Sequence, residues 1–327
     1  MTVPGDRAVG IDIGGTLIKG GWVDAGGRLF SPWEIPTPAG GPAAETVTAL
    51  SRAIRAFAGR RRPLAVGVGC AGLVSSHLGI VHVSPNLPVW NEVPLGPLLG
   101  EELEAPVFVL NDANAFALAE ACAGAGLGLS PVVALTLGTG VGGAIVIDGH
   151  LAEGLHGFGG EVGHMSIAWD GPPCPCGNRG CLELFIGRRG LVAAYLARSE
   201  WAPGEIAHDL AGGDRAALDP RLLARAAEAG DRIARDVFAA AGEALGTALA
   251  NLSNLIDPAI FVIGGGVAQA GDLLLDPARR SLAARAMIGA AGVAPVVPAA
   301  LGVRAGTIGA GLYAYDRLAT STPRRPA

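Results

Sequence analysis

Two stretches of the chain carry the same hairpin pattern, and this repeat constrains the fold more than any other feature. In the first stretch, an apolar run, a Gly14-Gly15 turn and a second apolar run precede a turn that starts at Asp24. Aligning Gly14 with Gly138 brings Asp24 onto Asp148, so the two hairpins agree in length as well as in glycine placement. A repeated supersecondary unit predicts two lobes of similar topology that face each other across a cleft.

Strand-like and helix-like segments alternate along the remaining chain, which is typical of an α/β protein. Because the two hairpins form meanders, we expect the sheets to be mixed and not purely parallel. Helices are predicted at about residues 44–58, 112–123 and 224–256 and from near residue 305, and strands at 64–68, 107–110 and 259–263.

A chain of 327 residues is long enough for about two domains. We expect a small α/β lobe from residues 1–115 and 305–320. A large α/β lobe with a metal-binding segment is expected at 116–304, and a disordered tail at 321–327.

The composition argues against several classes of function. Charged residues make up 16% of the chain and the net charge is −5, so no basic surface for nucleic acid or membrane is expected. The N-terminal segment lacks the layout of a signal peptide, and glycines or prolines interrupt the longest apolar runs. Cys70 and Cys122 are predicted to be free thiols, which indicates a reducing cytoplasm.

The segment CPCGNRGC predicts a metal site. Cys174, Cys176 and Cys181, together with His164, form a Cys3His set, which is typical of structural Zn²⁺. A redox loop or a set of unlinked thiols is the alternative, although Cys174 and Cys176 are too close for an easy mutual disulfide.

Three glycine-rich segments are candidates for nucleotide binding. Gly14-Gly15-Thr16 and Gly138-Thr139-Gly140 lie at hairpin tips, where backbone N–H groups can approach phosphate oxygens. Asp12 is placed to hold Mg²⁺ or its waters, and Lys19 to offset phosphate charge. Gly264-Gly265-Gly266 follows a predicted strand, where both an adenosine contact and a plain strand-to-helix turn remain open. There is no P-loop motif.

A set of polar side chains could recognise a polyol. Asn111-Asp112 lies where a strand meets a helix, so an ordinary helix cap is one interpretation. The other is that Asp112 accepts the proton of an attacking hydroxyl while Asn111 orients the acceptor. Glu161, His164 and Glu183 would complete the hydrogen-bonding set.

Six segments, in order over nearly the whole chain, resemble the ROK sugar kinases (repressor, open reading frame, kinase), and among these the bacterial glucokinases most closely. They are DIGGTLIK (Asp12 to Lys19), NDAN (Asn111 to Asn114), LGTGVGGA (Leu137 to Ala144), GEVGH (Gly160 to His164), CPCGNRGCLE (Cys174 to Glu183) and IGGGV (Ile263 to Val267). The resemblance implies a two-lobed fold of the actin, Hsp70 and hexokinase type (ribonuclease H-like), with mixed sheets flanked by helices. It also implies ATP as donor with Mg²⁺, a structural Zn²⁺, and homodimers or homotetramers.

The resemblance further assigns roles to single residues. It places the catalytic base on Asp112, sugar contacts on Asn111, Glu161, His164 and Glu183, and phosphate contacts on Gly14, Gly15, Thr16, Gly138 and Thr139. The adenosine glycines fall on Gly264, Gly265 and Gly266. Gly72 matches the glycine of the family's proline-glycine pair, and Asn86 is expected to border the sugar. Ala71 stands where the family often has proline, so the resemblance does not fix the shape of one pocket wall.

The leading prediction is a kinase that transfers phosphate from ATP to the 6-hydroxyl of glucose. A kinase for N-acetylmannosamine, N-acetylglucosamine, mannose or fructose is an alternative, and so is polyphosphate as the donor. A sugar-sensing regulator is the alternative from another class. It would have to lack a DNA-binding domain, because the core motif begins almost at the first residue of the sequence.

Overall fold

The computed structural model describes residues 7–38, 40–59, 61–289 and 292–321. Of the expected disordered tail, only Ser321 falls within this range, as the last residue of a helix; residues 322–327 lie outside it.

The chain groups into two compact units. The first comprises Met1–Gly128, Ala144–Gly160 and Ala300–Ala327, and the second comprises Leu129–Gly143 and Glu161–Ala299. Residues 116–128, 144–160 and 300–304 therefore belong with the first unit, whereas the sequence-based division assigned them to the large lobe. Residues 116–123 stay with the first unit because they continue helix α3 (Asp112–Ala123), which packs against the C-terminal helix.

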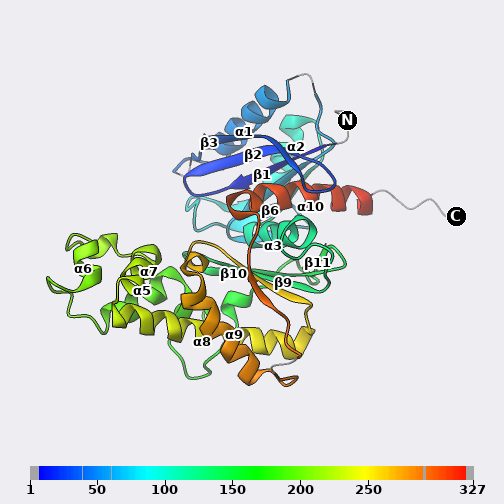
Figure 1. Ribbon diagram of the computed structural model, residues 1–327. Coiled ribbons are helices and arrows are strands. Elements are labelled where there is room, and N and C mark those ends of the chain that lie inside the picture. Colours follow the sequence, from blue (N-terminus) through cyan, green and yellow to red (C-terminus); the bar gives the residue numbers. More distant parts are fainter. Residues whose placement is uncertain (1–6, 39, 60, 290–291, 322–327) are drawn as a thin grey trace. The chain divides into compact units, whose positions relative to one another are not determined.

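The elements of both units are labelled in Figure 1 where there is room. Up to the end of α3 the chain forms β1 (Ala8–Ile13), β2 (Leu17–Val23), β3 (Leu29–Pro36), α1 (Ala43–Ala58), β4 (Val66–Cys70), β5 (Leu73–Ser75), β6 (Ile80–Val83), β7 (Asn91–Val93), α2 (Leu95–Leu103), β8 (Val107–Asn111) and α3. It continues with β9 (Val132–Leu137), β10 (Val141–Ile147), β11 (His150–Leu151), the 3-10 helix η1 (Val162–His164), α4 (Glu183–Ile186), α5 (Arg188–Leu196), α6 (Ile206–Leu210), α7 (Pro220–Glu228) and α8 (Arg232–Ile256). The last elements are β12 (Ile260–Gly264), α9 (Asp272–Arg285), β13 (Val296–Pro298) and α10 (Ala305–Ser321).

The two main sheets have the same strand plan, as the repeated hairpins predict. The first is five-stranded with the order β3-β2-β1-β4-β8, where β1–β2 and β2–β3 are antiparallel and β1–β4 and β4–β8 are parallel. The second, also five-stranded, has the order β11-β10-β9-β12-β13, again with a hairpin edge followed by parallel strands. The predicted α/β class with mixed sheets is therefore confirmed.

Glycines in the strands of the first sheet allow α10 to lie directly on it. A Cβ at Gly10 of β1 would come 1.9 Å from the Thr307 carbonyl oxygen, and one at Gly67 of β4 would come 1.7 Å from that of Ala310. Backbone therefore packs on backbone. Apolar side chains from the strands and from α1 and α2 form the main core of this unit, including Val9, Ile11, Val68, Val109, Leu50, Ile54, Leu95 and Leu99.

The predicted long helix at 224–256 is two helices in the structure. α7 ends at Glu228 and α8 begins at Arg232, because Gly230 has a φ of +109° and Asp231 caps the second helix. The Asp231 carboxylate accepts the N–H of Ala234 at 3.0 Å. The end at Ile256 agrees with the prediction. Among the described residues, no helix is both long enough and apolar enough to cross a membrane.

Candidate active site

The carboxyl ends of strands β1, β4 and β8 bring predicted acceptor residues of the first unit together. In the parallel register, Ile13 lies opposite Cys70, and Cys70 lies opposite Asn111. Asp12 consequently comes close enough to Asp112 for the charge of Asp112 to raise its pKa. Open α/β sheets bind ligands at this edge, so the structure places these carboxylates where a substrate is expected.

Asn111 caps α3, as the helix-cap interpretation of the sequence predicted. Its Oδ1 accepts the N–H groups of Ala113 at 2.8 Å and Asn114 at 3.2 Å, while its Nδ2 donates to the Gly72 carbonyl at 2.9 Å. Gly72 has a φ of +121°, and a Cβ there would lie 2.1 Å from the Val83 carbonyl oxygen. Since the amide nitrogen has a second hydrogen, the cap leaves Asn111 a donor for a ligand.

Asp112 has the environment of a general base. It is the first residue of α3, and its Oδ1 accepts the N–H of Ala113 at 2.9 Å. Burial raises the pKa of Asp112, and the hydrogen bond from Ala113 opposes this rise. A carboxylate with a raised pKa binds a proton more strongly, which favours removal of a proton from a hydroxyl.

Asp12 lies opposite Lys19 and within electrostatic range of Asp112. Burial, followed by the charge of Asp112, raises the pKa of Asp12 to about 6, while Lys19 lowers it. Lys19 faces Asp12 in the register of β1 and β2. A Cβ at Gly306, in the first turn of α10, would come 2.7 Å from the Asp12 carboxylate, so this helix start requires a glycine. Two carboxylates within electrostatic range of each other suit a divalent cation.

Without Mg²⁺, the Asp12 carboxylate should destabilise the protein at neutral pH. Between pH 3.8 and about 6 the folded state keeps a proton that the unfolded state has released, so the free energy of unfolding falls as pH rises through this interval. We expect Asp12→Asn to remove this slope and to raise the free energy of unfolding at pH 7.5 by up to about 3 kcal/mol.

Urea unfolding of both proteins in EDTA at pH 4 and pH 7.5 measures this effect. Asp236→Asn, which removes an exposed carboxylate from α8, is the control and should change neither midpoint. An Asp12→Asn protein that is no more stable than the wild type at pH 7.5 would contradict the assignment.

Two hydrogen bonds from Thr37 hold the loop Gly14 to Thr16 at the tip of the β1–β2 hairpin. The Thr37 hydroxyl donates to the Gly14 carbonyl at 2.7 Å, and the Thr37 N–H donates to the Thr16 carbonyl at 2.9 Å. Gly15 and Thr16 are exposed, and Asn86 lies beside Gly15, with its Cγ 3.3 Å from where a Cβ would stand. The structure therefore places Asn86 next to the first predicted phosphate loop.

In the second unit, Glu183 holds the tip of the other glycine hairpin. Its Oε2 accepts the N–H of Val141 at 3.0 Å, and a Cβ at Gly140 would come 2.1 Å from the same oxygen. The Gly138 carbonyl accepts the N–H of Arg188 at 3.0 Å. Sequence reasoning assigned Glu183 to the sugar alone and missed this link, because no local motif joins Glu183 to a hairpin so far away in the chain.

The GEVGH segment is fastened beside the same hairpin. A Cβ at Gly163 would lie 1.9 Å from the Val141 carbonyl oxygen, so η1 packs on the start of β10. The N–H of Leu182 donates to the Met165 carbonyl at 3.0 Å, which joins the segment before Glu183 to the segment after His164. Glu161, which precedes η1, has an exposed side chain.

The four predicted metal ligands converge. The side-chain ligand atoms of His164, Cys174, Cys176 and Cys181 all lie within 4.8 Å of one another. The sulfurs of Cys176 and Cys181 are 3.8 Å apart, and Cys174 Sγ lies 3.8 Å from His164 Nδ1. Zn–S bonds of about 2.3 Å in a tetrahedron separate two sulfurs by about 3.8 Å, so the donor set fits this ion.

The glycine triplet begins with Gly264, the last residue of β12, and its other two positions have different local requirements. Gly265 has a φ of +89°, and a Cβ there would lie 2.3 Å from the Leu137 carbonyl oxygen. Gly266 has helical dihedral angles, and no atom lies within 4 Å of a Cβ placed on it. Packing of β12 against β9 therefore explains Gly265, while the space at Gly266 leaves room for a ligand.

Alanine substitutions should separate these two roles. We expect Gly265→Ala to lower the free energy of unfolding by about 2–4 kcal/mol, because it combines a left-handed conformation with a backbone clash. Gly266→Ala should change stability by less than about 0.5 kcal/mol and raise the KM for ATP. Urea unfolding and steady-state kinetics measure the two effects. Equal destabilisation by both variants would contradict this distinction.

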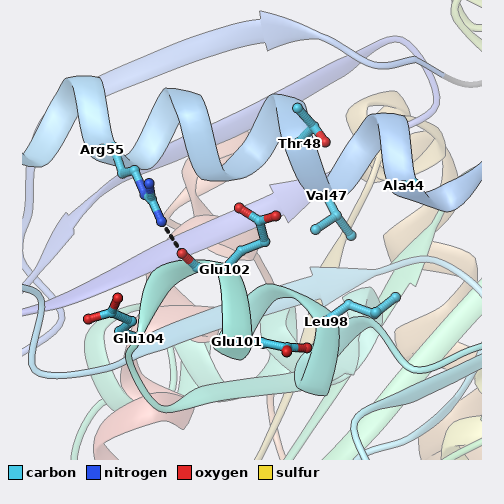
Figure 2. A pocket seen from close by; sticks show the side chains of 8 residues that line it. All are labelled: Ala44, Val47, Thr48, Arg55, Leu98, Glu101, Glu102 and Glu104. Carbon is cyan, nitrogen blue, oxygen red and sulfur yellow. Dashed lines mark hydrogen bonds between the residues drawn. The ribbon is translucent and has the colours of Figure 1, made fainter.

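A pocket of about 460 Å³ lies between α1 and α2 of the first unit. Figure 2 shows its lining residues, with the Arg55 guanidinium donating a hydrogen bond to the Glu102 carbonyl. None of the predicted site residues lines it.

Comparison with known proteins decides the family. The model of the ROK family matches residues 8–317. The chain belongs to the ROK family. It is 37% identical to the glucokinase of Streptomyces coelicolor over 306 residues, which is 92% of this chain and 95% of that protein. The crystal structure of a ROK family glucokinase from Streptomyces griseus in complex with glucose and AMPPNP aligns with a TM-score of 0.80 and 36% identity, over 95% of this chain and 99% of that one.

The ROK family also includes regulators that resemble this chain in part. The xylose repressor of Caldicellulosiruptor bescii is 33% identical over 225 residues, which is 69% of this chain and 56% of the repressor.

The predicted site residues of this ROK chain fall into two groups by unit. The first unit contains Asp12, Gly14, Gly15, Thr16, Lys19, Gly72, Asn86, Asn111 and Asp112; the second contains Gly138, Thr139, Glu161, His164, Cys174, Cys176, Cys181, Glu183, Gly264, Gly265 and Gly266.

Proposed function

We propose that this ROK protein transfers the γ-phosphoryl group of ATP to the 6-hydroxyl of glucose. The observation that carries the proposal is the position of Asp112, a half-buried carboxylate with a raised pKa at the carboxyl edge of the first sheet. Similarity to glucokinases over nearly the whole chain supports glucose as acceptor and ATP as donor.

In this mechanism Asp112 removes the proton from the 6-hydroxyl as its oxygen bonds to the γ-phosphorus. The bond from that phosphorus to the oxygen bridging to the β-phosphate breaks, and ADP leaves with the electron pair. Phosphoryl transfer requires chiefly positioning and charge neutralisation from a protein. Asn111 and Glu161 orient the sugar, and the backbone N–H groups of the two glycine loops bind the phosphates.

Metal ions have two roles in the proposal. Mg²⁺, held by Asp12 or its waters, neutralises phosphate charge when bound. Zn²⁺ in the Cys3His cluster is structural, because four protein ligands fill a tetrahedral ion. His164 directs Nδ1 toward Cys174, so its Nε2 is the nitrogen that reaches a sugar hydroxyl.

The proposal also includes a cytoplasmic homodimer or homotetramer that acts in glycolysis and binds neither membrane nor nucleic acid.

A coupled assay of ADP release tests the proposal. Glucose should give the highest kcat/KM among glucose, mannose, fructose, N-acetylglucosamine and N-acetylmannosamine, and ATP should exceed polyphosphate as donor. The absence of turnover with every sugar and donor would refute a kinase. Sugar binding without turnover, detected by calorimetry, would instead support the sugar-sensing regulator.

A further inference from the structure

Glu120 is a buried carboxylate on the helix that begins with Asp112. Its side chain is 0% exposed. Three backbone N–H groups donate to it: those of Ala125 and Ala300 to Oε2, each at 3.0 Å, and that of Leu301 to Oε1 at 2.8 Å. A charge this deeply buried is tolerated only when hydrogen bonds satisfy it, so the three donors define a built site for the carboxylate.

These three donors lie beside the first and the last of the points at which the chain passes between the units. The chain crosses four times, after residues 128, 143, 160 and 299; it first leaves the first unit after Gly128 and finally returns at Ala300. Glu120 therefore bonds to a residue shortly before the first crossing and to two residues at the last crossing.

The chain around Glu120 is shaped to admit the carboxylate. After α3 ends, the N–H groups of Gly124 and Gly126 donate to the Glu120 carbonyl at 3.2 and 2.9 Å. A Cβ at Gly124 would lie 2.2 Å from Glu120 Oε2, so a glycine is required for the chain to wrap around the side chain. Apart from Asp112, Glu120 is the only charged residue in the α3 sequence DANAFALAEACA, and this isolation is the sequence signal that marks it.

We propose that Glu120 is a positioning residue that joins the helix carrying Asp112 to the first and last crossing segments, so that these parts move as one during turnover. The inference rests on the proposed kinase function, in which Asp112 belongs to the first unit and the Gly138-Thr139 phosphate loop to the second. Catalysis that depends on positioning is sensitive to displacements of about 1 Å, so loosening this junction reduces turnover. Glu120 does not touch the substrate in the proposed mechanism.

Glu120→Gln tests the proposal with almost no change in side-chain size. An amide NH2 cannot accept a hydrogen bond, so one orientation leaves the N–H groups of Ala125 and Ala300 without their acceptor, and the other leaves that of Leu301 without its acceptor. Hydrogen exchange of peptides covering residues 125–128 and 299–302 should accelerate about tenfold or more. We expect kcat for glucose to fall about tenfold, with KM for glucose and ATP within about twofold of the wild type, because the ligand contacts are unchanged.

Glu153→Gln is the matched control. Glu153 is also buried in the first unit, where the Tyr313 hydroxyl of α10 donates to it at 3.2 Å. This variant should lower the unfolding midpoint while kcat and exchange at the two crossing segments stay at wild-type values. If Glu120→Gln does not fold, Gly124→Ala displaces the same carboxylate, and the same measurements apply.

Unchanged exchange at both segments in the variant would refute the junction. Faster exchange with unchanged kcat would refute the positioning role and leave Glu120 purely structural. A wild-type protein that phosphorylates no sugar would refute the proposed function instead, and the exchange measurement would still decide whether Glu120 holds the two segments.

Discussion

Asp112→Asn should lower kcat for glucose phosphorylation by about 10²–10⁴-fold, the usual contribution of a general base. Asparagine has nearly the same shape and can still accept the N–H of Ala113, so the start of α3 should keep its geometry. Glucose affinity should therefore remain within a few-fold of the wild type. Coupled kinetics and isothermal calorimetry measure the two quantities separately.

The control for this substitution is Asp236→Asn, which changes an exposed carboxylate on α8 and should leave kcat unaltered. Asp112→Asn with kcat within tenfold of the wild type would show that another group accepts the proton. Loss of glucose binding together with activity would indicate that Asp112 serves sugar binding and not proton transfer.

The pH profile provides a second readout of the same residue. A base works only in its ionised form, so kcat should fall as pH decreases through the pKa of Asp112. Because burial raises this pKa, the acid limb should lie above the ordinary carboxyl value of 3.8. The residual activity of Asp112→Asn should lack this limb.

Loss of the metal cluster is expected to have the second large effect. Cys181→Ser should reduce bound Zn²⁺ from about one ion per chain to near zero, since removal of a thiolate leaves an incomplete tetrahedron. Cys181 is buried and pairs with Ser166 in an isolated β-bridge, and Leu182 bonds to Met165. Without the ion we expect both Glu183 and the η1 segment to lose their fixed positions, and kcat/KM for glucose to fall at least about 100-fold.

Cys122→Ser is the matched control, because Cys122 lies outside the cluster on α3. It should retain the metal, the unfolding midpoint and the activity. Plasma emission spectroscopy gives the metal content, and thermal unfolding gives the midpoint. A wild-type protein that carries no metal when purified without chelator, or a metal-free variant with normal kinetics, would contradict the structural role of Zn²⁺.

Much of the fold follows from local patterns. The hairpins at residues 8–23 and 132–147, the helices α1 and α3 and the start of α10 lie where hydrophobic periodicity and turn residues place them. The prediction of one continuous helix at 224–256 is wrong at Gly230. The apolar periodicity continues on both sides of a turn there, and that turn depends on a positive φ. Periodicity records which face is buried and not whether the helix axis is continuous.

The candidate site divides in a similar way. Short spacings in the sequence pointed to the candidate Cys3His ligands, to Asn111-Asp112 and to both glycine loops, because each is defined by residues close together in the chain. Three features were not predicted, since they join residues far apart in the sequence. They are the hydrogen bond that Glu183 accepts from the Val141 N–H, the electrostatic effect of Asp112 on Asp12, and the burial of Glu120.

The amino-acid sequence by itself determined the repeated strand plan, the candidate metal ligands and the chemical types of the candidate acceptor residues, because turn geometry, side-chain period and ligand spacing act over a few residues. Only the tertiary structure decided which of these groups become basic, which become buried and which glycines must remain glycines. Those properties depend on solvent exclusion and on close approach of distant backbone segments, and both arise only when the sheets are assembled and the helices are packed on them.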